Sequence, residues 1–178
     1  MHLVRDAFPR PAHRAGLSGR EVGGVTAAAR VRVIALGSPM ARDDGAALRA
    51  GERLLEEGVD AEVVLAGRPG PGLLELLEPE VPTVLLDVVR GPAPGSVVEL
   101  GLDEVVGASL AGGALSSHGL GVAEAFRLAE ALGRTLPPGR FLGLAGAEFG
   151  PGEAPEPAVA AGIEELVAAA REAIEALR

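Results

Sequence analysis

Two adjacent carboxylates lie in the loop from Gly37 to Gly45, which we call the acidic loop. It joins an apolar stretch to an amphipathic one. In an α/β protein, a loop at this position usually carries glycines and backbone N–H groups that bind a phosphate. Asp43 and Asp44 instead suit a cation, a water molecule to be activated or a proton to be moved. The simpler alternative is that one acid only caps the following helix. Because both cannot be the cap, one of them is left free to point elsewhere.

Two further residues that could take part in chemistry lie far along the chain. Asp87 interrupts the apolar stretch 83–89 near its carboxyl end, where open parallel sheets bind their ligands. The alternatives for Asp87 are a cap of the next turn or an ion pair with Arg90. His118 stands where another helix is expected to begin, and taken alone it is a surface or capping histidine. If His118 and the acids converge, two carboxylates and one imidazole suit Ni, Zn, Fe or Mn better than Ca or Mg.

The elements that must position these residues alternate between strand and helix. Near-continuous apolar runs indicate buried parallel strands, and apolar residues at a spacing of three and four indicate helices. The segment 96–100 is short enough to return antiparallel at an edge, and 102–115 has no clear pattern. This order predicts a three-layer α/β/α sandwich with a mostly parallel, twisted sheet of about five strands. The expected strands are 31–36, 61–66, 83–89, 96–100 and 141–147, and the expected helices are 47–57, 73–77, 122–132 and 157–177.

Composition restricts the class of protein. With 178 residues, 48% of them hydrophobic, the chain can bury one core. A net charge of -9 and only 2% aromatic residues argue against nucleic acid as a partner, because phosphates are repelled and few rings can stack on bases. The lack of cysteine excludes a disulfide framework, a thiolate metal site and a cysteine nucleophile.

Residues 1–30 differ in charge from the rest. They hold five arginines against two acids, a net charge of +3, which leaves -12 for residues 31–178. We expect residues 1–30 to form a disordered N-terminal arm, with His2 and His13 in solvent, and residues 31–178 to form a single domain. No apolar run in the arm is long enough for a signal peptide or a membrane span, so we expect a cytoplasmic protein without membrane insertion.

Four segments of the chain together carry a family resemblance. They are 37–45, 67–77, 86–97 and Leu115-Ser116-Ser117-His118-Gly119-Leu120. In order and spacing they resemble the [NiFe]-hydrogenase maturation proteases, and the resemblance extends from about Val31 to the C-terminus. Members of this family are endopeptidases that remove a C-terminal extension from the hydrogenase large subunit once nickel has been loaded.

The resemblance implies that Asp44, Asp87 and His118 are the catalytic residues and the ligands of a metal. That metal is the nickel supplied by the substrate, with another divalent transition metal as the alternative. Asp43 then supports or caps the acidic loop. Cleavage requires a water polarised by the metal or a carboxylate acting as general base. A serine nucleophile beside His118 is disfavoured, because adjacent residues rarely align as nucleophile and base.

This sequence departs from the family pattern at three positions. Ser38 replaces an Asn, and its hydroxyl can still bond to the loop backbone. Leu65 stands where the family has an Asp at the end of the second strand, and Arg68 replaces the Thr of a Gly-Thr-x-Gly turn. Arg68 either reaches into the cleft toward a substrate carboxylate or points to water. We expect the second, because exposed arginines are common at turns.

The resulting hypothesis is an endopeptidase whose partner is the nickel-loaded precursor of a [NiFe]-hydrogenase large subunit. The alternative is a homologue that binds this precursor as a maturation chaperone without cutting it, motivated by Leu65 and Arg68. A third class, a phosphorylase-like hydrolase of small molecules, needs basic groups to hold an anion, and the acidic loop argues against it.

Overall fold

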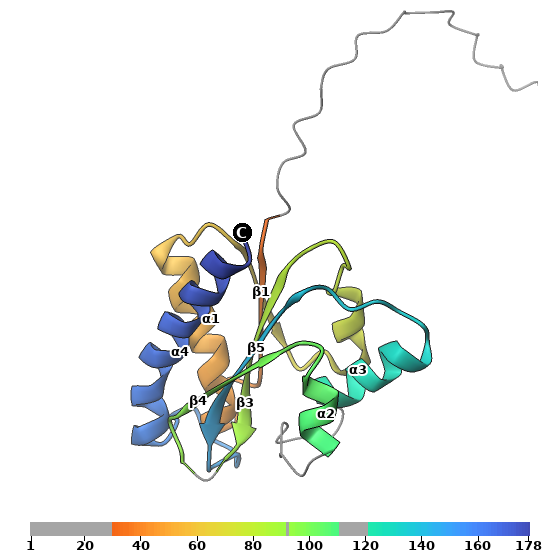
Figure 1. Cartoon of the computed structure of the whole chain (residues 1–178). Helices are drawn as coiled ribbons and strands as arrows, with labels where there is room; N and C mark the ends of the chain where they lie inside the picture. Colours follow the sequence, from red (N-terminus) through yellow and green to blue (C-terminus); the bar gives the residue numbers. More distant parts are fainter. Residues whose placement is uncertain (1–29, 92, 111–120) are drawn as a thin grey trace, which may run out of the picture.

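Five strands form one sheet in the order β2-β1-β3-β5-β4. The computed structural model describes residues 30–91, 93–110 and 121–178. Four strands run parallel, and β4 pairs antiparallel with β5 at one edge (Figure 1). This confirms the predicted mostly parallel sheet and its antiparallel edge strand. The strands are β1 Arg32–Leu36, β2 Glu62–Gly67, β3 Thr83–Arg90, β4 Val97–Gly101 and β5 Gly139–Gly146.

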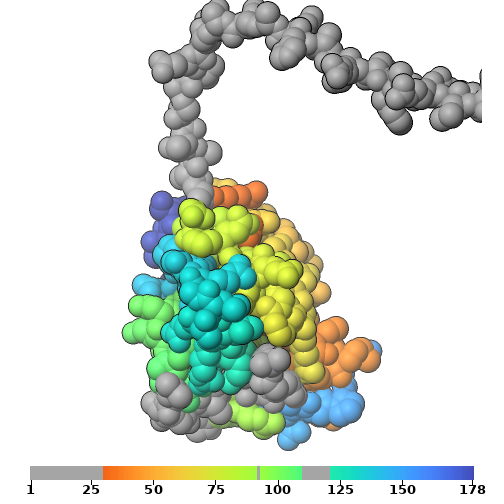
Figure 2. Space-filling model, turned by 90° about the vertical axis from the view of Figure 1, so that its right-hand side faces the viewer, coloured from red at the N-terminus to blue at the C-terminus, as the bar shows by residue number. Residues whose placement is uncertain are grey.

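Helices cover both faces of the sheet, which confirms the three-layer sandwich. On one face, α1 (Ala46–Glu57) and α4 (Pro157–Ala176) lie side by side (Figure 1). The other face holds α2 (Val105–Leu110), α3 (Val122–Ala131) and the 3-10 helix η2 (Gly70–Glu75), and Figure 2 shows α3 beside this last segment. None of the helices in the described part of the chain is both long enough and apolar enough to cross a membrane.

Local sequence signals explain where the two long helices begin or end. Gly58 terminates α1 in the left-handed conformation, with φ of 65°, and its N–H donates to the carbonyls of Leu54 and Leu55. Pro157 occupies the first turn of α4, where no backbone N–H is required.

Two short elements differ from the sequence-based expectation. The helix α2 lies within 102–115, where no element was predicted, because six residues are too few to display helical periodicity. The predicted helix 73–77 is instead the 3-10 helix η2, which begins three residues earlier with Pro71 in its first turn. Residues 1–29 lie outside the described range, so the division into arm and domain stays a prediction.

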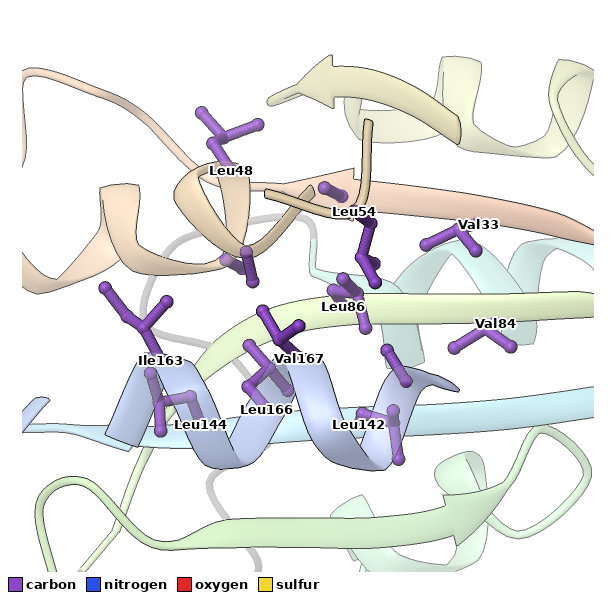
Figure 3. Close-up of a cluster of buried hydrophobic side chains, with 14 of the residues drawn as sticks. Val33, Leu48, Leu54, Val84, Leu86, Leu142, Leu144, Ile163, Leu166 and Val167 are labelled. Carbon is purple, nitrogen blue, oxygen red and sulfur yellow. The ribbon is translucent and has the colours of Figure 1, made fainter. Parts of the chain in front are cut away.

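Alternate residues of the strands divide between two cores. Val84 and Leu86 of β3 face α1 and α4, whereas Leu85 faces α3 and η2. Figure 3 shows the first core, in which Leu86 packs with Leu54 and Leu166 between the sheet and the two helices. By the same alternation, Asp87 faces the layer of α3 and η2.

Candidate functional site

The course of the chain sets apart one position in the sheet, at the carboxyl ends of β1 and β3. The connection through α1 leads to β2 on one side of β1, and the connection through η2 leads to β3 on the other. The winding direction therefore reverses between β1 and β3. In open α/β sheets, ligands bind outside the carboxyl ends of the strands at this point. The acidic loop follows β1, and Asp87 lies in the second half of β3.

Strands β1 and β3 stop pairing just before Asp87. The pairing of β1 with β3 ends at Ala35 and Leu86, after which Leu36 pairs with Gly67 of β2. Strand β3 continues alongside β5 for four more residues. Asp87 is thus the first residue of β3 beyond its pairing with β1, so it borders the loop that leaves β1.

Asp44 is buried and forms an ion pair with Arg68. Its side chain is 4% exposed, and its Oδ2 accepts hydrogen bonds from Nε of Arg68 at 3.0 Å and from Nη2 at 2.7 Å. The expectation that Arg68 points to water is therefore wrong. Because β2 pairs with β1, the turn after β2 lies beside the loop after β1, and the buried carboxylate attracts the guanidinium. The Arg68 side chain is still 46% exposed.

Asp87 is buried at the same edge and interacts electrostatically with this pair. Its Oδ1 accepts a hydrogen bond from the Val88 N–H at 2.8 Å. Burial raises the pKa of Asp87 to about 7, with a further increase from the negative charge of Asp44. The Val88 N–H and the positive charge of Arg68 act in the opposite direction. Asp44 and Asp87, which we call the acidic pair, thus form one electrostatic cluster with Arg68.

Arg90 does not pair with Asp87, contrary to one alternative considered for this acid. Its guanidinium carbon lies 4.6 Å from the centre of the Phe149 ring, in a cation–π contact. Successive residues of a strand point to opposite faces, so Asp87 and Arg90, three apart, face opposite layers of the sandwich. Asp87 accordingly takes no part in an ion pair with Arg90 and lies on the α3 and η2 side of the sheet.

Asp43 has a structural role in the loop. It is fully buried, and its carboxylate accepts hydrogen bonds from the N–H groups of Ala147 at 2.9 Å, Glu148 at 2.8 Å and Glu156 at 2.7 Å. It makes no side-chain cap bond to η1 (Arg42–Gly45) or to α1. Of its two expected roles, support is observed and capping is not. Asp43 fastens the acidic loop to the segment that joins β5 to α4.

Backbone geometry at Gly37 sets the shape of the acidic loop. Gly37 has φ of 123°, and a Cβ atom there would lie 1.9 Å from the backbone oxygen of Asp44. The loop is closed by hydrogen bonds from the N–H of Ala41 to Ser38 O and from the N–H of Asp44 to Ala41 O. Ser38 thus helps to hold the loop through its backbone carbonyl.

The third predicted ligand lies outside the described residues. His118 and the neighbouring Ser116 and Ser117 fall in 111–120, so their place relative to the acidic pair stays a prediction. Within the described ranges, no group of three or more His, Cys, Asp or Glu side chains could hold a metal ion. The buried carboxylates of Asp44 and Asp87 nevertheless suit a cation, because Asp44 already binds the positively charged guanidinium of Arg68.

The ion pair of Arg68 with Asp44 was not anticipated from the sequence. The two residues are 24 positions apart, and a signal could have come only from the parallel pairing of β1 with β2, which brings their following loops together. Leu65, at the other departure from the family pattern, pairs with Ala35 and is 42% exposed on the edge strand. It adds no charge to the cluster.

Comparisons with known proteins identify structures of the same fold. No protein-family model matches the chain, and no curated protein matches it. The [NiFe] hydrogenase maturation protease HybD from Thermococcus kodakarensis is 29% identical, over 80% of this chain and 97% of that one, with a TM-score of 0.66. The hydrogenase maturating endopeptidase HybD from E. coli is 25% identical, over 80% and 93% of the two chains, with a TM-score of 0.65.

A third structure extends the agreement in fold. An endopeptidase from E. coli, solved in solution, has a TM-score of 0.69 at 23% identity, over 83% of this chain and 93% of that one. Each of the three matches covers 80% or more of this chain. The chain has the fold of the [NiFe]-hydrogenase maturation proteases.

Proposed function

We propose that this protein is an endopeptidase that removes the C-terminal extension of a nickel-loaded [NiFe]-hydrogenase large-subunit precursor. The observation that carries the proposal is the meeting of two buried acids from separate strand ends, Asp44 and Asp87, at the reversal of winding. A buried acid pair at this position is suited to a cation and not to an anionic small molecule. The likeness to the two HybD structures supports the same activity.

The nickel ion belongs to the substrate in this proposal. Asp44 and Asp87, with His118 as the third ligand, recognise the ion held by the precursor, so that docking reports whether loading is complete. Carboxylate oxygens and an imidazole nitrogen are suitable donors for nickel. When the precursor docks, Asp44 exchanges its bond to Arg68 for the ion.

Peptide hydrolysis then requires a base that removes a proton from the attacking water. A general base works best when its pKa lies near the operating pH. Burial raises the pKa of Asp87 to about 7 before the ion arrives, but as a ligand of the ion its carboxylate is no longer free to take up a proton. We therefore propose that the substrate's ion activates the water by lowering its pKa, with Asp44 and Asp87 orienting the ion beside the scissile peptide.

The test is cleavage of a purified, nickel-loaded precursor, measured by the intact mass of the large subunit. Wild-type protein is expected to shorten the precursor by the mass of its C-terminal extension. Asp44→Asn, Asp87→Asn and His118→Ala are each expected to slow cleavage by about 100-fold or more. Glu172→Gln, an exposed acid on α4, serves as the control and should leave the rate unchanged. Full activity in all three site variants, with folding confirmed by circular dichroism, would overturn the proposal.

Two observations favour a second function, a maturation chaperone that binds the precursor without cutting it. Arg68 already neutralises Asp44, and Leu65 brings no carboxylate to the end of β2. If this function is correct, the precursor co-elutes with the protein in gel filtration and its mass stays unchanged. The cleavage assay therefore separates the two functions directly.

A further inference from the structure

Arg68 covers the solvent side of an otherwise buried acid. Two of its N–H groups, on Nε and Nη2, donate to the same oxygen of Asp44. The Asp44 side chain is only 4% exposed, whereas the side chain of Arg68 is 46% exposed. The partly exposed guanidinium therefore lies between the buried carboxylate and water on the side of Arg68.

The same guanidinium acts on both acids of the cluster. It bonds to Asp44, and its charge opposes the effect that Asp44 exerts on Asp87. A cation entering between the two acids meets an oxygen of Asp44 that already accepts two charged hydrogen bonds. Such bonds are stronger than those between neutral groups. The ion must replace them before it can be held by both carboxylates.

Displacement of Arg68 is possible without unfolding the turn. Half of the side chain is in solvent, so its head can move into water while the backbone of the turn after β2 stays in place. A hydrated metal ion has only its own coordination bonds to offset the lost ion pair. When a docked protein presents the nickel ion, the contacts between the two proteins also offset the lost ion pair.

We infer that Arg68 is a specificity-determining residue, which shields the acidic pair from metal ions in solution and yields only to an ion presented by a protein partner. The inference rests on the proposed function in one respect, namely that Asp44 and Asp87 meet the metal of the precursor. It concerns this chain's own departure from the Gly-Thr-x-Gly turn, since a threonine in place of Arg68 would leave Asp44 without this guanidinium.

The test is the affinity of the full-length protein for Ni²⁺ alone, measured by equilibrium dialysis. Arg68→Ala is expected to bind Ni²⁺ about tenfold or more tightly than wild type, because the charged hydrogen bonds to Asp44 no longer compete. Arg68→Lys is expected to fall between the two, because it keeps the charge and loses the forked geometry. Adding Asp44→Asn to Arg68→Ala should abolish the gain.

Arg140→Ala is the matched control. Its side chain is also 46% exposed, and it forms an ion pair of 3.1 Å with Glu99 near the opposite end of the sheet. The control removes the same charge, so it measures any general effect of a more acidic protein. Any nickel that His2 or His13 binds is common to all variants and cancels in the comparison.

The outcomes separate this inference from the proposed function. An equal affinity of Arg68→Ala and Arg140→Ala, or a gain that survives Asp44→Asn, overturns the role of Arg68. If Arg68→Ala gains affinity while wild type leaves a nickel-loaded precursor uncut, the shielding role stands and the protease assignment fails. Thermal unfolding of each variant checks that the protein is folded, and Arg68→Lys provides the comparison if Arg68→Ala is not.

Discussion

Asp43 and Asp44 are neighbours in the chain, but their carboxylates serve different parts of the molecule. They lie in the 3-10 helix η1, where successive side chains point about 120° apart. One carboxylate is thus directed to the segment between β5 and α4, and the other to the turn after β2. At the scale of single residues, the first acid holds the loop and the second pairs with Arg68.

Removal of the Asp43 carboxylate should destabilise the whole protein. We expect Asp43→Ala to lower the free energy of unfolding by about 3 kcal/mol, because three backbone N–H groups lose a charged acceptor. Asp43→Asn should cost less, since its single oxygen can still accept part of this set. Urea denaturation measures both, with Glu172→Gln as the control. A change below about 0.5 kcal/mol in Asp43→Ala would show that the three bonds contribute little.

Asp87 should make stability fall as the pH rises toward neutrality. Its pKa of about 7 in the folded protein exceeds the value of about 4 in an unfolded chain, so the native state holds this proton more tightly. The contribution of this proton to the free energy of unfolding is complete below about pH 4 and is lost as the pH rises through 7. A shift of this size corresponds to at most about 4 kcal/mol.

The measurement compares wild type with Asp87→Asn in urea at several pH values. We expect the difference in unfolding free energy between the two proteins to change from pH 4 to pH 7 in favour of the variant, and to be flat above pH 7. Asn can still accept the Val88 N–H, so the comparison isolates the charge. Asp103→Asn, at an exposed acid, should show no such trend. If the unfolding free energies of wild type and Asp87→Asn change with pH in the same way, Asp87 is not a buried acid with a raised pKa.

At the scale of elements, the separation of β1 from β3 creates the place for the site. Strand β1 turns toward β2 at Leu36, and the N–H of Gly37 donates to Gly67 O at 2.9 Å. The acidic loop then folds back so closely that Gly37 touches the backbone of Asp44. A residue without a side chain is required at this contact and at its positive φ.

Gly37→Ala should therefore distort the acidic loop and destabilise the protein. Its Cβ would lie 1.9 Å from the backbone oxygen of Asp44, which no rotamer change can relieve. We expect a loss of about 3 kcal/mol or more in urea unfolding, together with loss of precursor cleavage. Gly107→Ala, in α2, is the control, because a Cβ there meets nothing within 4 Å. A stable Gly37→Ala protein with normal cleavage would show that the loop tolerates another path.

At the scale of the whole molecule, two cores on opposite faces of the sheet hold the strands that carry the acids. Asp44 follows a strand whose residues contribute to both cores, as Val33 and Ile34 show. Damage to either core should therefore lower global stability, whereas exposed apolar residues should contribute little.

Leu166→Ala tests this at the centre of the first core. Leu166 is fully buried between α4 and the sheet (Figure 3), so its truncation should cost about 2–5 kcal/mol in urea unfolding. Leu132→Ala, at a side chain that is 62% exposed, should change stability by less than about 0.5 kcal/mol. Below its unfolding transition, Leu166→Ala should still cleave precursor. Equal losses in the two variants would contradict the description of the core.

The sequence alone determined the layers of this protein and the strand ends that hold its acids. Apolar periodicity is local, so it located all five strands and the two long helices to within a few residues. The alternation of strands with helices then required a mostly parallel sheet, with Asp44 and Asp87 at its carboxyl edge. The family resemblance, carried by short motifs, agrees with the fold. The short helices α2 and η2 were missed or misplaced because they span too few residues to show a helical period.

Only the tertiary structure decided which side chains meet. The bond between Arg68 and Asp44 depends on the register of β1 against β2, and the bonds of Asp43 reach backbone groups more than 100 residues away. The raised pKa of Asp87 depends on burial by segments that are distant in the chain. Sequence patterns record how each segment is buried, whereas contacts between segments are set by strand register and loop path, which emerge only when the layers pack together.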